Sequence, residues 1–371
     1  MLTVAPLTAT AGTAYAEGEG VQKQQWALDA VNARDAWKTT KGKGVTVAVL
    51  DTGVDTSHPD IKGNAEKGKD FVRMGAKKGD RPWARHGTAM AGIVAGHGHG
   101  KGGKAGVMGI APEASILPVR VLLEESDPQR EKAREKRGSA LAQGIRWAAD
   151  HGADVINLSL GDDSSSAHPE AREDAAVRYA LRKGAVVIAS SGNGGEKGDH
   201  ISYPAAYPGV IAVAAVDKYG ARASFSTRRW YATLAAPGKD VLIADPDRRY
   251  YEGWGTSAAA AVASGTAALV RAAHPDLSPA QIKQLLAETA AHTPEGGRSD
   301  ALGTGVVDAS AAIEVGAHMK PRAQAPAQLH YKTQYFGKGP GPDSAWPALV
   351  AAVTGTLLIA AAVALHRTKL R

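Results

Sequence analysis

Short apolar runs recur along the middle of the chain, separated by amphipathic stretches. The runs at 45–50, 114–122, 153–160, 184–192 and 209–216 are rich in Val, Ile, Leu and Ala, and each is bounded by turn residues. Continuous apolar runs of this length are typical of strands that are covered on both faces of a parallel sheet.

The stretches between these runs have the composition of helices. They cover 87–96, 139–152 and 169–184, and the last two end at a glycine, which commonly stops a helix. Residues 21–40 are also predicted to be helical. The alternation of strands and helices predicts an α/β fold, with a doubly wound, mainly parallel sheet and helices on both of its faces. Ligands bind such sheets at the carboxyl ends of the strands, so the residues that follow the strands deserve inspection.

One further helix, 258–273, is unusual because it is apolar on all sides. Nine of its sixteen residues are alanine, and Arg271 carries its only charge. A helix of this kind is predicted to be buried, and its small side chains let neighbouring elements approach closely.

Three residues with complementary chemistry lie at element boundaries in this scheme. Asp51 ends the first strand in "VLDTGVD", His86 opens a helix in "ARHGTAMAGIVAG", and Ser257 opens the alanine-rich helix in "GTSAAAAVASG". A serine hydroxyl needs an imidazole to take its proton, and a buried carboxylate orients that imidazole and stabilises its charged form. Each motif alone is weak. In the order Asp, His, Ser, each beside a suitable element, they predict a catalytic triad.

Asn193 provides a fourth group. It lies in "ASSGNGG", just beyond the run 184–192. Its side-chain amide and the Ser257 N–H could donate hydrogen bonds to the oxyanion of a tetrahedral intermediate. The alternative is a turn residue in a glycine-rich loop, and Asn193 taken by itself would favour that alternative.

Rival chemistries find less support. The glycine-rich stretch 96–106 lacks the Lys-Ser/Thr ending of a phosphate-binding loop. His97 and His99 could ligate a metal, but the sequence places no third ligand beside them. "DTG" as half of an aspartic protease would need a second copy, which the chain does not contain. No metal and no cofactor are therefore expected.

Taken together, these motifs resemble the subtilisin-like serine proteases. The resemblance extends from about residue 44 to residue 313 and includes "VAVLDTGVD", "RHGTAMAGIVAG", "GVMGIAPEASILPVRVL", "DVINLSLG", "SSGNGG" and "WGTSAAAAVASGTAALV". It implies triad roles for Asp51, His86 and Ser257 and the oxyanion role for Asn193. It also implies that one segment pairs with an extended substrate and another lines the primary specificity pocket. The residues concerned are Ser159, Leu160 and Gly161 for the first and Ser190, Ser191 and Gly192 for the second.

The chain departs from the family pattern at two positions beside the proposed nucleophile. The family usually has a proline four residues after the serine, where this chain has Ala261, and a larger residue than Ala258 directly after it. Alanine is a good helix former, so the helix should persist. Neither change removes a catalytic group, and both are expected to affect only the rate.

Composition and the chain ends suggest where the protein works. The net charge is +7, but the Lys and Arg residues are scattered, so nucleic acid is not an expected partner. There are no cysteines, which excludes disulfides and cysteine catalysis. The charged segment 124–137 is interpreted as a solvated surface insertion.

The predicted segments are a signal-peptide remnant (1–16), a catalytic domain with a short N-terminal extension (17–320), a Pro/Gly-rich linker (321–345), a transmembrane helix (346–365) and a basic tail (366–371).

Within the family, this architecture is most similar to the mycosins, the membrane-anchored proteases of type VII secretion. The resemblance and the basic tail together predict a single-pass protein of the cell membrane, with an extracellular catalytic domain and a cytoplasmic C-terminus. The expected partners are a protein or peptide substrate, the membrane and a type VII secretion complex. The alternative is a protease-shaped scaffold that stabilises this complex, with catalysis secondary.

Overall fold

The computed structural model describes residues 20–323. The chain divides into two units, 1–331 and 332–371, and all described residues belong to the first. The predictions for 1–16, for the linker after 323, for the transmembrane helix and for the tail lie outside the described residues. None of the helices within 20–323 is long and apolar enough to cross a membrane.

A seven-stranded sheet forms the centre of the described part, and every pair of neighbouring strands in it is parallel. The strand order confirms the doubly wound arrangement, because the chain extends the sheet first to one side of β1 and then to the other. In spatial order the strands are β2 (Lys69–Asp70), β5 (Ser115–Arg120), β1 (Thr46–Asp51), β6 (Val155–Leu158), β7 (Val186–Ser190), β8 (Ile211–Val216) and β9 (Ala232–Pro237).

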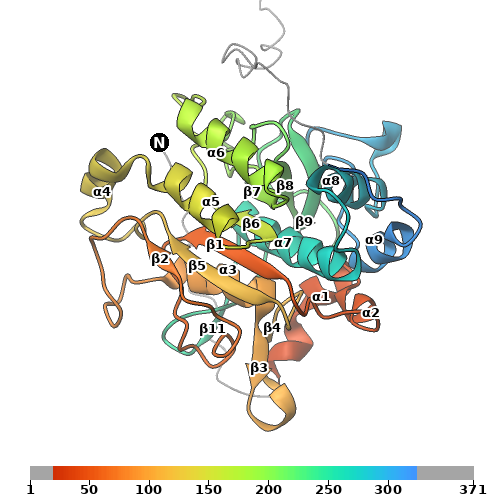
Figure 1. The fold of residues 1–371 in the computed structure, drawn as a ribbon, viewed down its shortest axis with the longest axis horizontal. Coiled ribbons are helices and arrows are strands. Elements are labelled where there is room, and N and C mark those ends of the chain that lie inside the picture. The colour runs from red at the N-terminus through yellow and green to blue at the C-terminus, as the bar shows by residue number, and fades with distance from the viewer. Residues whose placement is uncertain (1–19, 324–371) are drawn as a thin grey trace, which may run out of the picture. The chain divides into compact units, whose positions relative to one another are not determined.

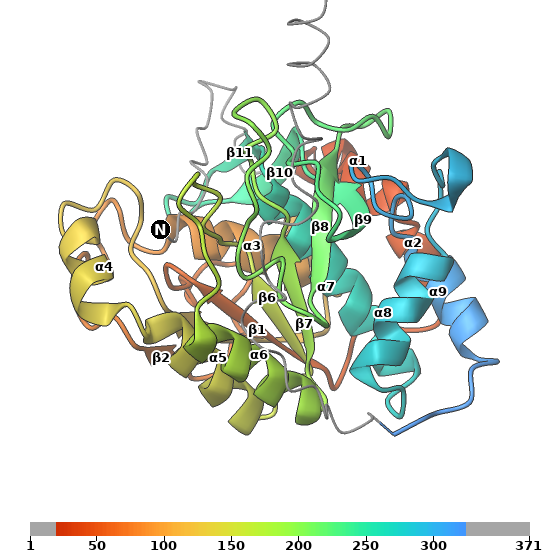
Figure 2. The same ribbon diagram turned by 90° about the horizontal axis from the view of Figure 1, so that it is seen from above.

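Helices cover both faces of this sheet (Figures 1 and 2). The pair α3 (Arg85–Ala95) and α7 (Thr256–Ala273) packs on one face, and the pair α5 (Ala140–Asp150) and α6 (Ala171–Arg182) on the other. The remaining α-helices are α1 (Trp26–Ala30), α2 (Ala33–Ala36), α4 (Arg130–Arg137), α8 (Pro279–Glu288) and α9 (Ala309–Gly316).

The smaller elements complete the unit. Two short antiparallel hairpins are formed by β3 (His97–His99) with β4 (Ala105–Met108), and by β10 (Val241–Ala244) with β11 (Tyr250–Gly253). The 3-10 turns are η1 (Val21–Gln24), η2 (Lys101–Gly103) and η3 (Glu295–Gly297). The lead-in 21–40 is therefore η1, α1 and α2 rather than one longer helix.

The alanine-rich helix α7 lies in the core, as its composition predicts. All its residues from Thr256 to Arg271 are buried. Gly265 explains how closely it packs, since a Cβ atom there would lie 2.6 Å from the Cβ of Ile110. Ala261 and Ala258 are both buried within an unbroken helix, so the missing proline does not disturb it.

The segment 124–137 is only partly the solvated insertion that its charges predict. Much of α4 is exposed, but Asp127 and Arg130 are buried and Glu124 is partly buried. Asp127 accepts a hydrogen bond from the Ala76 N–H at 2.7 Å, and Arg130 donates to the Leu123 carbonyl. The interpretation was wrong for these residues because their partners lie far away in the sequence or are backbone atoms.

Candidate active site

Four strands of the sheet bring polar residues to the same edge, at their carboxyl ends. Asp51 is the last residue of β1, Ser159 follows β6, and Asn193 lies just beyond β7. The same edge receives Glu124 from the segment after β5. This is where a doubly wound sheet is expected to bind ligands.

Asp51 and His86 form a buried pair at this edge. Asp51 is fully buried and His86 is 2% exposed. Both carboxylate oxygens of Asp51 face the imidazole, since Oδ1 lies 2.8 Å and Oδ2 2.9 Å from His86 Nδ1. The helix α3 can start directly against β1 because Gly87 has no side chain, and a Cβ there would lie 1.9 Å from the Gly53 carbonyl oxygen.

The charges around His86 outweigh the effect of its burial. Burial alone lowers the pKa of an imidazole, but the charge and hydrogen bond of Asp51 raise it, and the charge of Glu124 adds to them. The net effect is a raised pKa for His86. The other ring nitrogen, Nε2, is buried and has no hydrogen-bond partner among residues 20–323. It is therefore free to accept a proton from a group that approaches it.

Ser257 occupies the second position of α7, on the face of the sheet that α3 also covers. It is buried, with 4% exposure, like the rest of the helix up to Arg271. Its hydroxyl donates to the Ser159 carbonyl at 3.0 Å, and the Ser159 hydroxyl donates to the Ser257 carbonyl at 2.8 Å. These reciprocal bonds join the start of α7 to the end of β6. The serine hydroxyl must turn away from Ser159 to donate to His86.

Asn193 lies beside the start of α7, and hydrogen bonds to its side-chain oxygen fix its position. Its Oδ1 accepts hydrogen bonds from the N–H and the hydroxyl of Thr256, both at 2.9 Å, and its own N–H donates to Asp163 at 2.8 Å. The amide nitrogen Nδ2 has no partner within the described range, so it remains available as a donor. It lies near the tight turn at Gly255, which has a φ of 142° and directly precedes the helix.

The two predicted substrate-binding segments are neighbours. The Ser190 hydroxyl donates to the Leu160 carbonyl at 3.3 Å, because β6 and β7 are adjacent. Gly161 packs closely against Ser202, where a Cβ would lie 2.6 Å from the hydroxyl oxygen. Gly192 has a φ of 107°, and its carbonyl accepts the Thr227 N–H at 3.0 Å.

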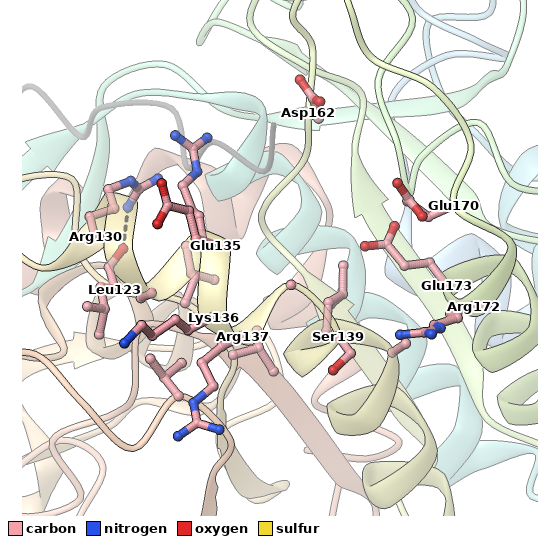
Figure 3. A pocket seen from close by; sticks show the side chains of 18 of the residues that line it. Leu123, Arg130, Glu135, Lys136, Arg137, Ser139, Asp162, Glu170, Arg172 and Glu173 are labelled. Atoms are coloured by element: carbon pink, nitrogen blue, oxygen red, sulfur yellow. Dashed lines mark hydrogen bonds between the residues drawn. The ribbon is translucent and has the colours of Figure 1, made fainter.

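A pocket of about 770 Å³ opens beside the first of these segments (Figure 3). Apolar residues that follow β5 and residues of α5 line part of it, and Asp162 reaches it from the segment after β6. Figure 3 shows basic side chains of α4, including Arg130, Lys136 and Arg137, across from Glu170 and Glu173. Burial raises the pKa of Glu173 to about 7, against the opposing effect of its hydrogen bond from Tyr207.

The histidines considered as metal ligands have protein partners instead. His97 faces the carbonyls of Gly98 and Lys62, and His99 Nδ1 lies 2.5 Å from a carboxylate oxygen of Asp60. No cluster of three or more metal-binding side chains occurs within 20–323.

Sequence reasoning missed one residue of the site, Glu124, and gave another, Ser159, only part of its role. Ser159 was expected to pair with substrate, but it also binds Ser257 directly through its carbonyl and hydroxyl. Glu124 was treated as part of a solvated insertion. It was recognisable in principle, because it lies four residues after the end of β5, at the edge where ligands bind.

The comparisons with known proteins identify the family to which the chain belongs. Residues 42–305 match the model of the Subtilase family, so the chain belongs to this family and is a subtilisin-like serine protease. It is 37% identical over 294 residues to Subtilisin BL of Lederbergia lenta, covering 78% of this chain and 99% of that one. It is also 37% identical over 250 residues to the Major intracellular serine protease of Bacillus subtilis (strain 168), covering 66% and 74%. The chain spans only 45% of another relative, fervidolysin of Fervidobacterium pennivorans.

Solved structures with similar folds include the mycosins, as the resemblance in the sequence suggested. MycP1 from Mycobacterium smegmatis matches with a TM-score of 0.69 and 29% identity, over 89% of this chain and 93% of that one. The MycP3 protease from the type VII (ESX-3) secretion system matches with a TM-score of 0.64 and 31% identity, over 78% and 87%.

Proposed function

We propose that this serine protease is an endopeptidase in which Asp51, His86 and Ser257 are the catalytic residues. The observation that carries the assignment is the buried Asp51–His86 pair, which leaves Nε2 of the imidazole without a partner. Ser257 is the hydroxyl that starts the helix packed against α3, and it is anchored to the same sheet edge through Ser159.

The chemistry follows from these positions. The Ser257 oxygen attacks the carbonyl carbon of the scissile bond while His86 Nε2 takes the hydroxyl proton. Asp51 keeps the proton on Nδ1 and stabilises the imidazolium. The oxyanion of the tetrahedral intermediate accepts hydrogen bonds from Asn193 Nδ2 and the Ser257 N–H.

The intermediate collapses when the C–N bond breaks and His86 gives its proton to the leaving amine. An acyl-enzyme ester on Ser257 remains. A water molecule then attacks this ester, with His86 again accepting the proton. The bond between the acyl carbon and the Ser257 oxygen breaks, His86 returns the proton to that oxygen, and the acyl part leaves as a carboxylic acid.

Substrates are proposed to bind as extended peptides along 159–161. Pairing of this kind uses main-chain hydrogen bonds and accepts many sequences. The wall formed by 190–192 would hold the side chain before the cleaved bond.

We further propose that the protein is anchored in the cell membrane by 346–365, with the protease outside and the tail inside, and that it processes proteins of type VII secretion. The 18 uncharged residues 348–365 and the basic residues after them support the anchor. The similarity of the fold to MycP1 and MycP3 supports the link to secretion.

A matched pair of serine variants tests the catalytic assignment. Ser257→Ala should abolish Ser257-dependent peptide cleavage and leave the protein folded, because alanine suits the helix and only the hydrogen bond to the Ser159 carbonyl is lost. Ser264→Ala, seven residues further along α7, removes a buried hydroxyl bonded to Asn157 and should keep the activity. Equal loss of activity in both variants would refute the assignment.

The same variant, introduced into the producing organism, distinguishes the scaffold alternative from a catalytic role, with secretion as the measurement. If cleavage alone matters, secretion fails with Ser257→Ala as it does with deletion of the gene. If secretion persists with Ser257→Ala and fails on deletion, the scaffold role is supported.

A further inference from the structure

Glu124 places a second carboxylate beside the imidazole of His86. It lies in the segment that follows β5, on the opposite side of β1 from Ser159. Its Oε1 accepts the backbone N–H of His86 at 2.8 Å, and it also forms a side-chain hydrogen bond with Thr52. Nothing in the triad scheme assigns a role to this residue.

The bond to His86 fulfils a need of the helix that carries the imidazole. The first N–H groups of an α-helix have no partner within the helix and are usually capped by a side chain at its start. At α3 the capping position is Ala84, which has a left-handed backbone and no side-chain acceptor. Glu124 supplies the missing acceptor from another element, and its negative charge suits a helix N-terminus.

Thr52 extends this contact to β1. Its hydroxyl oxygen accepts the Gly87 N–H at 3.2 Å and its side chain is bonded to Glu124. Asp51, directly before it, holds the imidazole. The end of β1, the start of α3 and the segment after β5 are thus joined by hydrogen bonds around His86.

The charges that face this cluster come from four elements. His86 faces Asp51 from β1, Glu124 from the segment after β5, and Arg130 from α4. Glu124 in turn interacts with Arg85 at the start of α3 and with Arg130. Burial raises the pKa of Glu124, and it outweighs the charge of His86 and the bonds from Thr52 and the His86 N–H, which lower it, so the net effect is a raised pKa.

We propose that Glu124 is a positioning residue for the general base, which fixes the start of α3 through the His86 N–H and stabilises the imidazolium with its charge. The inference rests on the proposed role of His86. The hydrogen bond and the charge of Glu124 can be tested separately. Glutamine keeps an oxygen acceptor and removes the charge, whereas alanine removes both.

The test compares Glu124→Gln, Glu124→Ala and the wild-type full chain, with Glu125→Gln as the matched control. Glu125 is the next residue, carries the same charge and is exposed. The measurement is kcat/KM for a peptide substrate as a function of pH, together with the melting temperature. The acidic limb of this pH profile, where kcat/KM rises with pH, reports the protonation of the base in the free enzyme.

In Glu124→Gln the acidic limb should move to lower pH, because an imidazolium that loses a neighbouring negative charge gives up its proton more readily. In Glu124→Ala kcat should also fall, by roughly 10- to 100-fold, because the helix start is no longer fixed. KM should change much less than kcat. Glu125→Gln should leave the limb where it is.

A purely structural role for Glu124 would lower the melting temperature and leave the limb unmoved, and that result would overturn the proposal. An equal displacement of the limb in Glu125→Gln would overturn it as well.

A second readout does not depend on turnover. The imidazole of His86 can be titrated by nitrogen NMR in a Ser257→Ala background, with and without Glu124→Gln. The proposal requires a lower His86 pKa in the double variant. Failure of the proposed function would appear differently, as a wild-type protein without Ser257-dependent hydrolysis.

Discussion

Replacing Asp51 by asparagine perturbs the proposed base with little change in shape. In the native protein both carboxylate oxygens lie within 2.9 Å of His86 Nδ1, so this nitrogen must carry the proton. An asparagine amide can turn its NH2 group toward Nδ1. The imidazole then carries its proton on Nε2, where it can no longer accept one from Ser257.

Two estimates give the size of the effect. The wrong tautomer in a Ser-His-Asp triad costs roughly 10⁴ in turnover, which is about 5.5 kcal/mol at ~1.4 kcal/mol for each factor of ten. The lost attraction between the carboxylate and the imidazolium is about 4 kcal/mol for unit charges about 4 Å apart at an effective dielectric constant of ~20. The two estimates are of similar size, so the lost attraction is large enough to account for most of the expected effect.

The assay is kcat/KM for a peptide substrate over a range of pH. The base works as the neutral imidazole, and its pKa is raised from the usual 6.5, so wild-type activity should increase with pH and reach its plateau above that value. In Asp51→Asn the plateau should fall by about 10⁴-fold, and the limb should move to lower pH.

Asp55→Asn is the control for a buried carboxylate that does not touch His86. Asp55 is bonded to Ser57 and paired with Arg248, and its loss should affect stability more than turnover. If Asp51→Asn stayed within about tenfold of the wild-type rate, the assignment of the dyad would be wrong, because ~10⁴ is expected.

Three further predictions concern the surroundings of the site. Asn193→Ala should lower kcat by roughly 10²- to 10³-fold with little change in KM, since the amide acts on the oxyanion; an unchanged kcat would exclude it from the oxyanion site. Gly265→Ala should lower the free energy of unfolding in urea by about 1–3 kcal/mol, because the new methyl group would meet Ile110 at 2.6 Å; unchanged stability would contradict the close packing. Glu173, with a pKa raised from 4.5 to about 7, binds its proton more tightly in the folded state, so its contribution to stability is fully present below pH 4.5 and falls as pH rises to 7. The fall amounts to roughly 3 kcal/mol and should be absent in Glu173→Gln, and an identical pH profile for the two proteins would contradict it.

The sequence was informative wherever the deciding interactions are local. The apolar runs located the strands to within a few residues, for example 209–216 against the observed Ile211–Val216. Asp51 and His86 could be identified because each sits at the boundary of its own element. The structure places the two side chains in contact, with Asp51 at the end of β1 and His86 at the start of α3.

The environment of a charged residue was harder to predict, because it depends on partners distant in sequence. Glu124 and Arg130 occur in a run of alternating charges that suggests a solvated helix, yet one is bonded to the helix of the base and the other to the Leu123 carbonyl. The hydroxyl of Ser257 is bonded to Ser159, a contact between residues 98 positions apart. Local patterns carry no information about such pairs.

The central claim is that Ser257 is the nucleophile, and a fluorophosphonate probe tests it most directly. The full chain is labelled, digested and mapped by mass spectrometry, with Ser257→Ala and Ser264→Ala treated in parallel. The proposed function predicts a single adduct on the peptide that contains Ser257, present in the wild type and in Ser264→Ala and absent from Ser257→Ala. A folded wild-type protein that carries no adduct, or one that carries it on another residue, would contradict the claim.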